Sequence, residues 1–245
     1  MIAEGDPPAA QLPGKAEPPG AGAPAERGAP VQGGAPVERG APVQGGAQPQ
    51  GGAQVGGTSA GELEVLLPAA ARVWLAGARQ EPLATSFPAV GRKVGHGRLS
   101  PAWTADQAVR ALLLVGKAAD EVLAVYRYGD AAEKLAVLHA LSVADVADAL
   151  QEQAVPIVED ALRTNDQRLV AAALGPYATQ HLNQHAFRHA VLKCVFANIP
   201  LAVVDGLPKR VDPELIRMMT DFAAERSAAG RAIPTDLEAY LNSPP

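Results

Sequence analysis

The feature that most restricts the fold is the spacing of alanine and leucine from Ser59 to the C-terminus. Apolar residues recur there at the three- and four-residue intervals that place them on one face of a helix. Ser59 followed by Glu62 matches the capping box that begins many helices. Alternating β-branched runs are scarce, and the main strand candidate, Ile199–Val204, is too isolated to build a sheet. The sequence therefore predicts an all-α domain.

Glycine and proline mark the ends of the predicted helices. The stretch from Pro82 to Pro101 contains three glycines and predicts a long loop, and Gly175 followed by Pro176 predicts a break. The predicted helices cover residues 60–79, 104–127, 130–152, 155–164, 166–174, 178–198 and 212–229. Their amphipathic faces favour antiparallel neighbours, packed either as a bundle or as HEAT-like stacked pairs.

The first 57 residues differ in composition from the rest of the chain. They are almost entirely Ala, Gly, Pro, Gln and Glu, lack aromatic residues, and repeat six-residue units such as APVQGG from Ala29 and Ala41. The proline before each valine disfavours a β-solenoid, and so little apolar surface cannot offset the entropy lost on ordering. We therefore expect a disordered Ala/Gly/Pro-rich tail over residues 1–57 and one helical domain over residues 58–245.

The composition excludes several functional classes. The net charge is −5 and basic residues are scattered, whereas nucleic-acid binding requires a basic surface. Cys194 is the single cysteine, which excludes an internal disulfide. The N-terminus has no apolar signal-peptide core, and the longest apolar run, Val65–Gly77, is interrupted and too short to cross a bilayer. We expect a soluble cytoplasmic protein with no transmembrane segment and no nucleic-acid partner.

Histidines recur every four residues in the predicted helix 178–198, at His181, His185 and His189. The outer two lie about 12 Å apart at about 1.5 Å per residue, so at most an adjacent pair can share an ion. Such a pair forms half of a zinc site, but zinc needs three or four ligands, and the HExxH motif is missing. Cys194 points away from His189 and cannot complete the set. His185 and His189 are the candidate metal ligands, although we expect no cofactor, with a divalent metal as the alternative.

Arg188 lies within the apolar stripe of the same helix, at about 300° on a helical wheel that starts at His185. An unpaired charge there is very costly, so the guanidinium must either meet a carboxylate or open onto a cleft. The candidate carboxylates are Glu159, Asp160, Asp221 and Glu225. In the alternative interpretation, Arg188 binds a phosphate or carboxylate, and the rim of its pocket is formed by His185, His189 and Lys193.

Several sequence blocks follow one another in the last third of the chain. They are Arg163 with Asn165, Pro176 with Tyr177, HAFRHAVLKCVF at 185–196, IPL from Ile199, DGL from Asp205, DPEL from Asp212, and DFAAERSAAGR ending at Arg231. Together these blocks resemble the EboA family of metabolite-traffic proteins. The resemblance implies a component of a bacterial gene cluster of secondary metabolism that moves small-molecule precursors toward the cell envelope. It implies no established reaction.

The resemblance and the polar residues together predict a noncatalytic helper. We expect it to bind and hand over a small anionic metabolite, or to bind a protein of the same pathway, either free in the cytoplasm or peripheral to the inner membrane. One alternative is a metal-dependent or His-assisted enzyme in which His185 and His189 act as ligands or as acid and base. Another is a purely structural scaffold. The expected ligand-binding residues are Arg163, Asn165, Arg188, His189, Lys193 and Arg231, and no catalytic residue is assigned.

Overall fold

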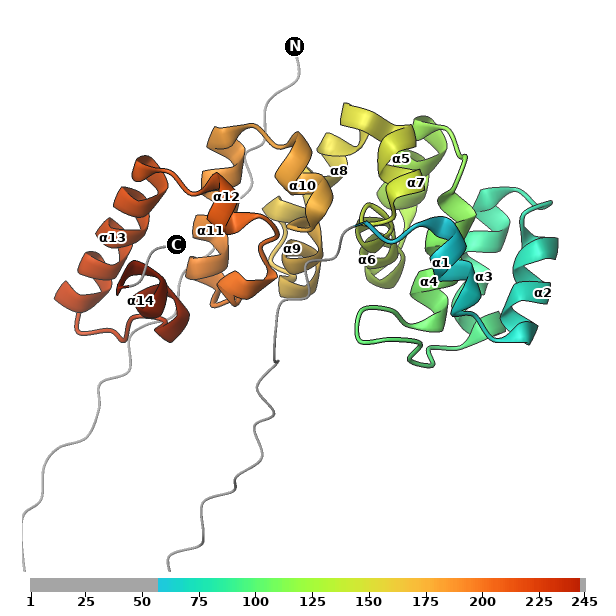
Figure 1. Cartoon of the computed structure of the whole chain (residues 1–245), viewed down its shortest axis with the longest axis horizontal. Helices are drawn as coiled ribbons and strands as arrows, with labels where there is room; N and C mark the ends of the chain where they lie inside the picture. Colours follow the sequence, from blue (N-terminus) through green and yellow to red (C-terminus); the bar gives the residue numbers. More distant parts are fainter. Residues whose placement is uncertain (1–56, 243–245) are drawn as a thin grey trace, which may run out of the picture. The chain divides into compact units, whose positions relative to one another are not determined.

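The computed structural model describes residues 57–242, which form an all-α fold (Figure 1). Apart from two isolated β-bridges, this part of the chain contains no β-structure. The predicted fold class is therefore confirmed. The tail predicted over residues 1–57 lies, except for Gly57, outside the described residues, as do the last three residues of the predicted domain.

Short connections join the helices of the described region. The α-helices are α1 (Ala60–Val65), α2 (Ala69–Ala78), α3 (Leu83–Val94), α4 (Ala105–Leu114), α5 (Ala119–Tyr128), α6 (Ala131–Ala140), α7 (Ala144–Leu150), α8 (Val155–Arg163), α9 (Gln167–Ala173), α10 (Pro176–His181), α11 (Gln184–Ala197), α12 (Leu207–Arg210), α13 (Pro213–Ala228) and α14 (Thr235–Asn242). Two 3₁₀-helices, η1 (Gln151–Ala154) and η2 (Leu201–Val203), lie between them.

These helices pack in chain order as stacked pairs. One row consists of α4, α6, α9, α11 and α13, and each member contacts the next. Beside this row, α5 packs against α6, α8 against α9, and α14 against α13. Within residues 57–242, no helix before α9 packs extensively against α11, α13 or α14. Stacked pairs therefore describe the packing better than a closed bundle, the other architecture predicted from the sequence.

Polar caps fix the ends of several helices. At α1, the Oγ atom of Ser59 accepts the N–H of Glu62, and the Glu62 carboxylate accepts the N–H of Ser59 at 2.8 Å, which confirms the predicted capping box. At α11, Oδ1 of Asn183 accepts the N–H of Ala186 at 2.8 Å. The same helix ends at Asn198, whose left-handed φ of +55° is one that asparagine tolerates. Local sequence thus sets both ends of α11.

The prediction of a long loop between Pro82 and Pro101 is wrong, because most of that stretch forms helix α3. Pro82 precedes the first turn, where a missing N–H costs little, but Pro88 lies inside the helix. Phe87 and Val90 are buried on one face of α3. Burial of this face outweighs the unfavourable helix propensity of proline and glycine.

Four predicted long helices are each divided into two. The predicted helix 60–79 breaks at Pro68, and the predicted helix 104–127 breaks at Gly116, whose φ is +72°. The predicted helix 178–198 breaks at Leu182, which has an extended backbone and precedes the Asn183 cap. The fourth, over residues 130–152, becomes α6 and α7.

Other predicted elements agree more closely. The predicted helices 155–164, 166–174 and 212–229 correspond within two residues to α8, α9 and α13. The candidate strand Ile199–Val204 forms no sheet, as its isolation predicted, and contains the 3₁₀-helix η2. A single short apolar run without a partner strand gains nothing from an extended conformation.

Two charged residues on α4 are buried, and both have partners. Nη1 of Arg110 lies 3.0 Å from Oδ2 of Asp106, and its Nε donates to the carbonyl of Phe87 at 3.3 Å. The hydroxyl of Thr104 donates to Asp106 at 2.7 Å, and Nδ1 of His96 lies 3.1 Å from the same carboxylate. The network ties α3 and the following loop to α4 without leaving an unpaired charge in the core. The sequence pattern did not indicate it.

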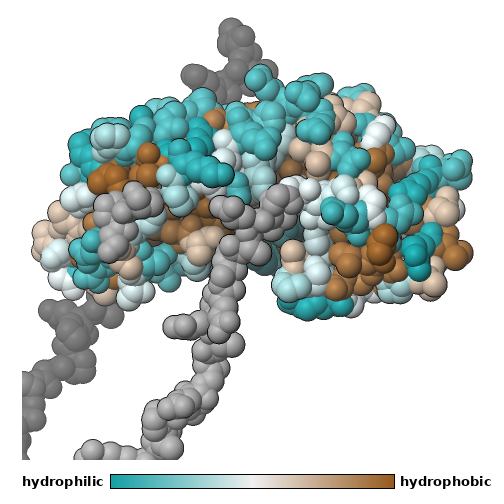
Figure 2. Space-filling view, in the orientation of Figure 1, coloured by the Kyte–Doolittle hydropathy of each residue, from teal (hydrophilic) through white to brown (hydrophobic). Residues whose placement is uncertain are grey.

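The face shown in Figure 2 is mostly hydrophilic and carries separate hydrophobic patches. The most exposed large apolar side chains include Val65, Val73, Tyr128 and Phe196, which belong to four different helices. From residue 57 to residue 242, no helix combines the length and the apolar character that crossing a bilayer requires.

Candidate ligand-binding site

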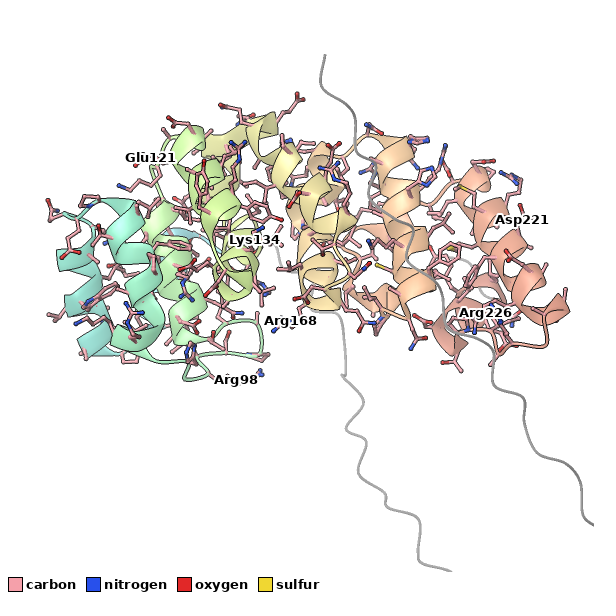
Figure 3. The ribbon with its side chains drawn as sticks, turned by 180° about the vertical axis from the view of Figure 1, so that it is seen from behind. Arg98, Glu121, Lys134, Arg168, Asp221 and Arg226 are labelled. Atoms are coloured by element: carbon pink, nitrogen blue, oxygen red, sulfur yellow. The ribbon has the colours of Figure 1, made fainter. Side chains whose placement is uncertain are left out.

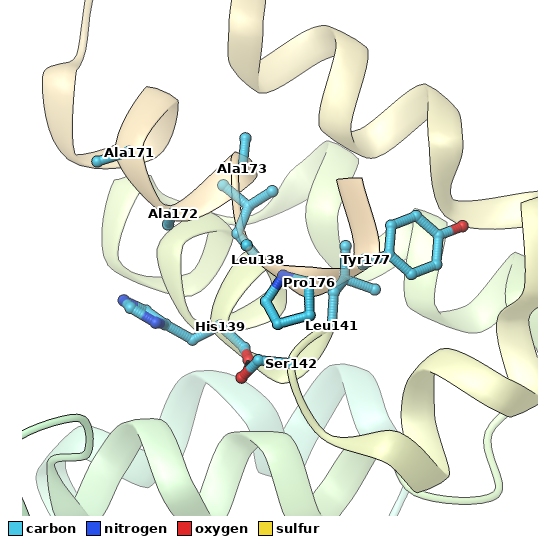
Figure 4. Close-up of a pocket in the computed structure, with 10 residues that line it drawn as sticks. Leu138, His139, Leu141, Ser142, Ala171, Ala172, Ala173, Pro176 and Tyr177 are labelled. Carbon is cyan, nitrogen blue, oxygen red and sulfur yellow. Dashed lines mark hydrogen bonds between the residues drawn. The ribbon is translucent and has the colours of Figure 1, made fainter. Parts of the chain in front are cut away.

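A cavity of about 160 Å³ lies between α6 and the turn that joins α9 to α10 (Figure 4). Its wall is mostly leucine, alanine and proline, with a histidine, a serine and a tyrosine among them. The lining residues are Leu138, His139, Leu141, Ser142, Ala171, Ala172, Ala173, Gly175, Pro176 and Tyr177. Apolar cavities of about 150 Å³ in other proteins bind benzene, so this one can accept a single six-membered ring.

His139 supplies the cavity with a polar group whose hydrogen bonds are unused. Within the described residues its imidazole makes no hydrogen bond, and its ring packs against Trp103 with centroids 6.2 Å apart. Burial lowers the pKa of His139, so the ring is neutral at pH 7 and offers one donor and one acceptor. Figure 4 shows the imidazole on the opposite side of the cavity from Tyr177. A ligand with one hydrogen-bonding group could therefore be oriented at His139.

Tyr177 supports the cavity wall, and its hydroxyl points away from the other labelled residues (Figure 4). The hydroxyl donates to the carbonyl of Gln151 and accepts the N–H of Ala154 at 3.1 Å. Burial raises the pKa of Tyr177. On α10, the ring of His181 stacks on the tyrosine ring with centroids 4.3 Å apart. Tyr177 therefore holds η1 against α10 and is not available to a ligand through its hydroxyl.

On α11, Arg188 pairs with Asp212, the residue that caps α13. Nη2 of Arg188 lies 2.5 Å from Oδ2 of Asp212, and Nε contacts both carboxylate oxygens at 3.1 Å. Asp212 also accepts the N–H of Leu215 at 2.9 Å, so one carboxylate both caps a helix and binds the arginine. The Arg188 guanidinium holds the pKa of Asp212 well below its ordinary value.

This geometry confirms the ion pair predicted for Arg188 but not its predicted partners. None of them contacts Arg188 among the described residues, so the proposed pairing with Glu159, Asp160, Asp221 or Glu225 is wrong. The Arg188 side chain is 26% exposed, and its Nε and Nη2 atoms donate to Asp212, whereas Nη1 has no partner among the described residues. An anion could reach Nη1 only beside the Asp212 carboxylate, which would repel it.

A second arginine, Arg210, was not identified from the sequence. Its guanidinium donates to the carbonyls of Ala178 and Leu182 at 3.3 and 2.9 Å, and to Oε1 of Gln184 at 3.0 Å. It also lies 4.2 Å from the centroid of the Phe187 ring. Burial lowers the pKa of Arg210. Arg210 therefore satisfies the open carbonyls at the end of α10 and ties this helix to α12.

The other predicted ligand-binding residues lie at separate places. Arg163 ends α8 and is exposed, 4.0 Å from Asp160, and Asn165 is exposed in the turn before α9. On α11, His189 is exposed and Lys193 is half-buried. None of these side chains lines the cavity.

Arg231 is too far from Arg188 to share a small ligand with it. Arg188 pairs with Asp212 before α13, and Arg231 follows that helix, whose 16 residues span about 24 Å. The N–H of Arg231 donates to the carbonyl of Arg226 at 2.8 Å, and Figure 3 shows Arg226 near the C-terminal end of α13. The structure therefore separates the predicted set into at least two groups.

His185 and His189 lie one turn apart on α11, with Nε2 atoms 3.2 Å apart. His181 belongs to α10 because the helix breaks at Leu182, so the prediction of three histidines on one helix is wrong. Cys194 is buried, and burial raises its pKa to about 12. Between residues 57 and 242, no three His, Cys, Asp or Glu side chains form a metal-binding group.

The described residues define an all-α protein of stacked helix pairs with a small, mostly apolar cavity. The family model of the metabolite traffic protein EboA matches residues 77–242, and this chain therefore belongs to the EboA family. The resemblance found in the sequence blocks is thus confirmed, and the matched range includes both the cavity and α11. No curated protein and no solved structure gives a significant match to the chain.

Proposed function

We propose that this chain is a noncatalytic helper of metabolite traffic, which binds a small metabolite in the cavity and passes it to another protein of the same pathway. One observation carries the proposal, namely that a mostly apolar cavity of about 160 Å³ contains the unused hydrogen-bonding groups of His139. Such a combination of an apolar wall and a few polar groups is typical of ligand sites.

The lining indicates the chemical class of the ligand. The cavity favours a ring or a short hydrocarbon portion of about the size of benzene, with one group that hydrogen-bonds to His139. The lining contains no lysine or arginine, and burying an unpaired carboxylate or phosphate there would be very unfavourable. If the metabolite is anionic, its charged group therefore remains outside, at the mouth of the cavity.

Two of the three polar groups of the cavity, the hydroxyls of Tyr177 and Ser142, favour binding over catalysis. The Tyr177 hydroxyl is already engaged by backbone groups, and its raised pKa opposes ionisation. The Ser142 hydroxyl donates to the carbonyl of His139 at 2.7 Å and not to an imidazole that could activate it. Holding and releasing a ligand needs neither group to exchange a proton.

The surface of α11 that carries Arg188, His189 and Lys193, called the α11 surface below, is a second candidate site and would suit an anionic metabolite. Within residues 57–242, Lys193 forms no ion pair, whereas Arg188 is neutralised by Asp212. Lys193 with His189 could therefore bind a carboxylate or phosphate without displacing a carboxylate of the protein. Arg163 and Asn165 would join only a ligand that extends to the end of α8.

Native mass spectrometry of the full chain, purified from its own host, tests the proposed function. We expect a small-molecule adduct in the wild type and its loss in Ala172→Leu, because the added side chain fills the cavity. The matched control is Ala132→Leu, which changes an exposed alanine on α6 and should leave the adduct intact. His139→Phe keeps a ring of similar size but removes its hydrogen bonds, and it should weaken the adduct.

Circular dichroism and thermal unfolding establish that each variant is folded. An adduct that persists in folded Ala172→Leu, or the absence of any adduct in the wild type, contradicts the proposed cavity function. Loss of the adduct in Lys193→Gln, with retention in Ala172→Leu, assigns the metabolite to the α11 surface instead.

A further inference from the structure

The two exposed histidines on α11 have the geometry of two ligands of one metal ion. Their Nε2 atoms are 3.2 Å apart, and the ring centroids are 4.4 Å apart with a tilt of 51°. Two nitrogens that each lie about 2.0–2.1 Å from an ion are about 3.2 Å apart when the angle at the metal is about 100°. His185 and His189 therefore need little rearrangement to bind an ion between them.

The helix holds this pair in place. Residues four apart lie on the same side of a helix, and Asn183 caps α11 just before the first of the two histidines. Without an ion, the facing nitrogens can make one N–H···N hydrogen bond at most, which requires one ring to donate and the other to accept. Both rings are exposed, so an ion can reach them from solvent.

The charge around the pair is compatible with a cation. Arg188 lies between the two histidines in sequence and would repel an ion if its charge were unopposed. Asp212 contacts its guanidinium through both carboxylate oxygens, and Glu214 adds a further negative charge nearby. The local positive charge of Arg188 is therefore largely offset, whereas Lys193, one turn beyond His189, forms no ion pair among the described residues and weakens the binding of a cation.

We propose that His185 and His189 form a surface site for one late first-row divalent cation, with Cu²⁺ bound most tightly. Imidazole suits Cu²⁺, Ni²⁺ and Zn²⁺, and the intrinsic order of affinity favours Cu²⁺ over the other two. Because the protein supplies two ligands, the remaining positions belong to water or to an added donor, and the site is weaker than a four-ligand structural zinc site. The site shares no residue with the cavity and does not depend on ligand binding there, although it shares His189 with the second candidate site on α11.

Isothermal titration calorimetry of the full chain without an affinity tag tests this site, with CuCl₂ and NiCl₂ as the titrants. We expect one Cu²⁺ per chain, with an affinity that His185→Ala and His189→Ala each reduce by about tenfold or more. His181→Ala is the matched control, because that histidine lies on α10 and stacks on Tyr177. It should leave the affinity unchanged.

Thermal unfolding gives a second measurement. An ion that bridges two turns of α11 binds the folded chain preferentially, so NiCl₂ should raise the Tm of the wild type and of His181→Ala. The double variant His185→Ala/His189→Ala should show no such increase. The proposal is overturned if the wild type binds no stoichiometric ion, or if the folded double variant binds Cu²⁺ with the affinity of the wild type.

Discussion

The α11 surface and the cavity beside α6 differ in whether their polar groups already have hydrogen-bond partners within the protein. On α11, Arg188 is bound by Asp212, and the adjacent Arg210 is bound by backbone carbonyls at the end of α10. In the cavity, the imidazole of His139 has no hydrogen-bond partner among the described residues. A charge that is paired within the protein can stabilise the fold without binding a ligand, so conspicuous charge alone does not identify a ligand site.

Among the arginines near α11, we expect the largest loss of stability on substitution at Arg210. Arg210→Met keeps the contact with Phe187 but leaves the carbonyls at the end of α10 without their donor. We expect the free energy of unfolding to fall by about 2–3 kcal/mol, measured by urea denaturation. The matched control Arg217→Met removes an exposed arginine paired with Glu214 and Asp221, and it should change stability little. Equal losses in the two variants would argue against a structural role specific to Arg210.

A smaller effect is expected at the cavity wall. Tyr177→Phe removes the hydrogen bonds to Gln151 and Ala154 while preserving the ring, and it should cost about 1–2 kcal/mol in urea denaturation. Ligand binding should survive, because the hydroxyl points away from the cavity. Loss of the native adduct at unchanged stability would instead make the hydroxyl a ligand contact.

A still smaller effect concerns pH. Because burial lowers the pKa of His139, the unfolded chain takes up a proton before the folded chain does as pH falls. Protonation of His139 in the unfolded chain therefore lowers the free energy of unfolding below about pH 6.5. The loss stops increasing once the pH is below the pKa of His139 in the folded chain. The urea midpoint should therefore fall less between pH 7 and pH 5 in His139→Phe than in the wild type. An equal fall of the urea midpoint in the two proteins would contradict a half-buried imidazole with a lowered pKa.

The ion pair on α11 acts in a different pH window. Asp212 has a lowered pKa in the folded chain, so its contribution to stability is complete above about pH 4 and is lost as the pH falls through the folded value. The ion pair of Asp212 therefore does not change how steeply stability varies with pH between pH 7 and pH 5. The contributions of His139 and Asp212 to stability therefore fall in different pH windows.

Part of the fold and of the environment of Arg188 could be predicted from the sequence. Apolar spacing and caps predict the all-α class and helices such as α8 and α13, because both signals are local. The inward position of Arg188 also follows from the helical wheel. Its partner Asp212 could not be chosen, since the breaks that set the path from α10 to α13 depend on tertiary packing. The sequence did not predict helix α3, because Pro88 and the nearby glycines indicate a loop, whereas the burial that stabilises the helix depends on tertiary packing.

The cavity could not be predicted for a related reason. Its wall combines residues 138–142 of α6 and the following turn with residues 171–177, and most of these side chains are ordinary core types. An unfilled volume between two helices has no sequence signal, because it depends on how closely their backbones approach.

Whether the cavity binds a ring at His139 is tested by titrating the chain with phenol, which has one ring and one hydroxyl group. The binding is monitored by nuclear magnetic resonance of the histidine side chains. The chain has five histidines, so each imidazole can be assigned by substitution. We predict saturable shifts of the His139 resonances that disappear in Ala172→Leu, while those of His185 and His189 stay unchanged. Shifts at the α11 histidines without a response from His139, or shifts of His139 that persist in folded Ala172→Leu, would contradict the account.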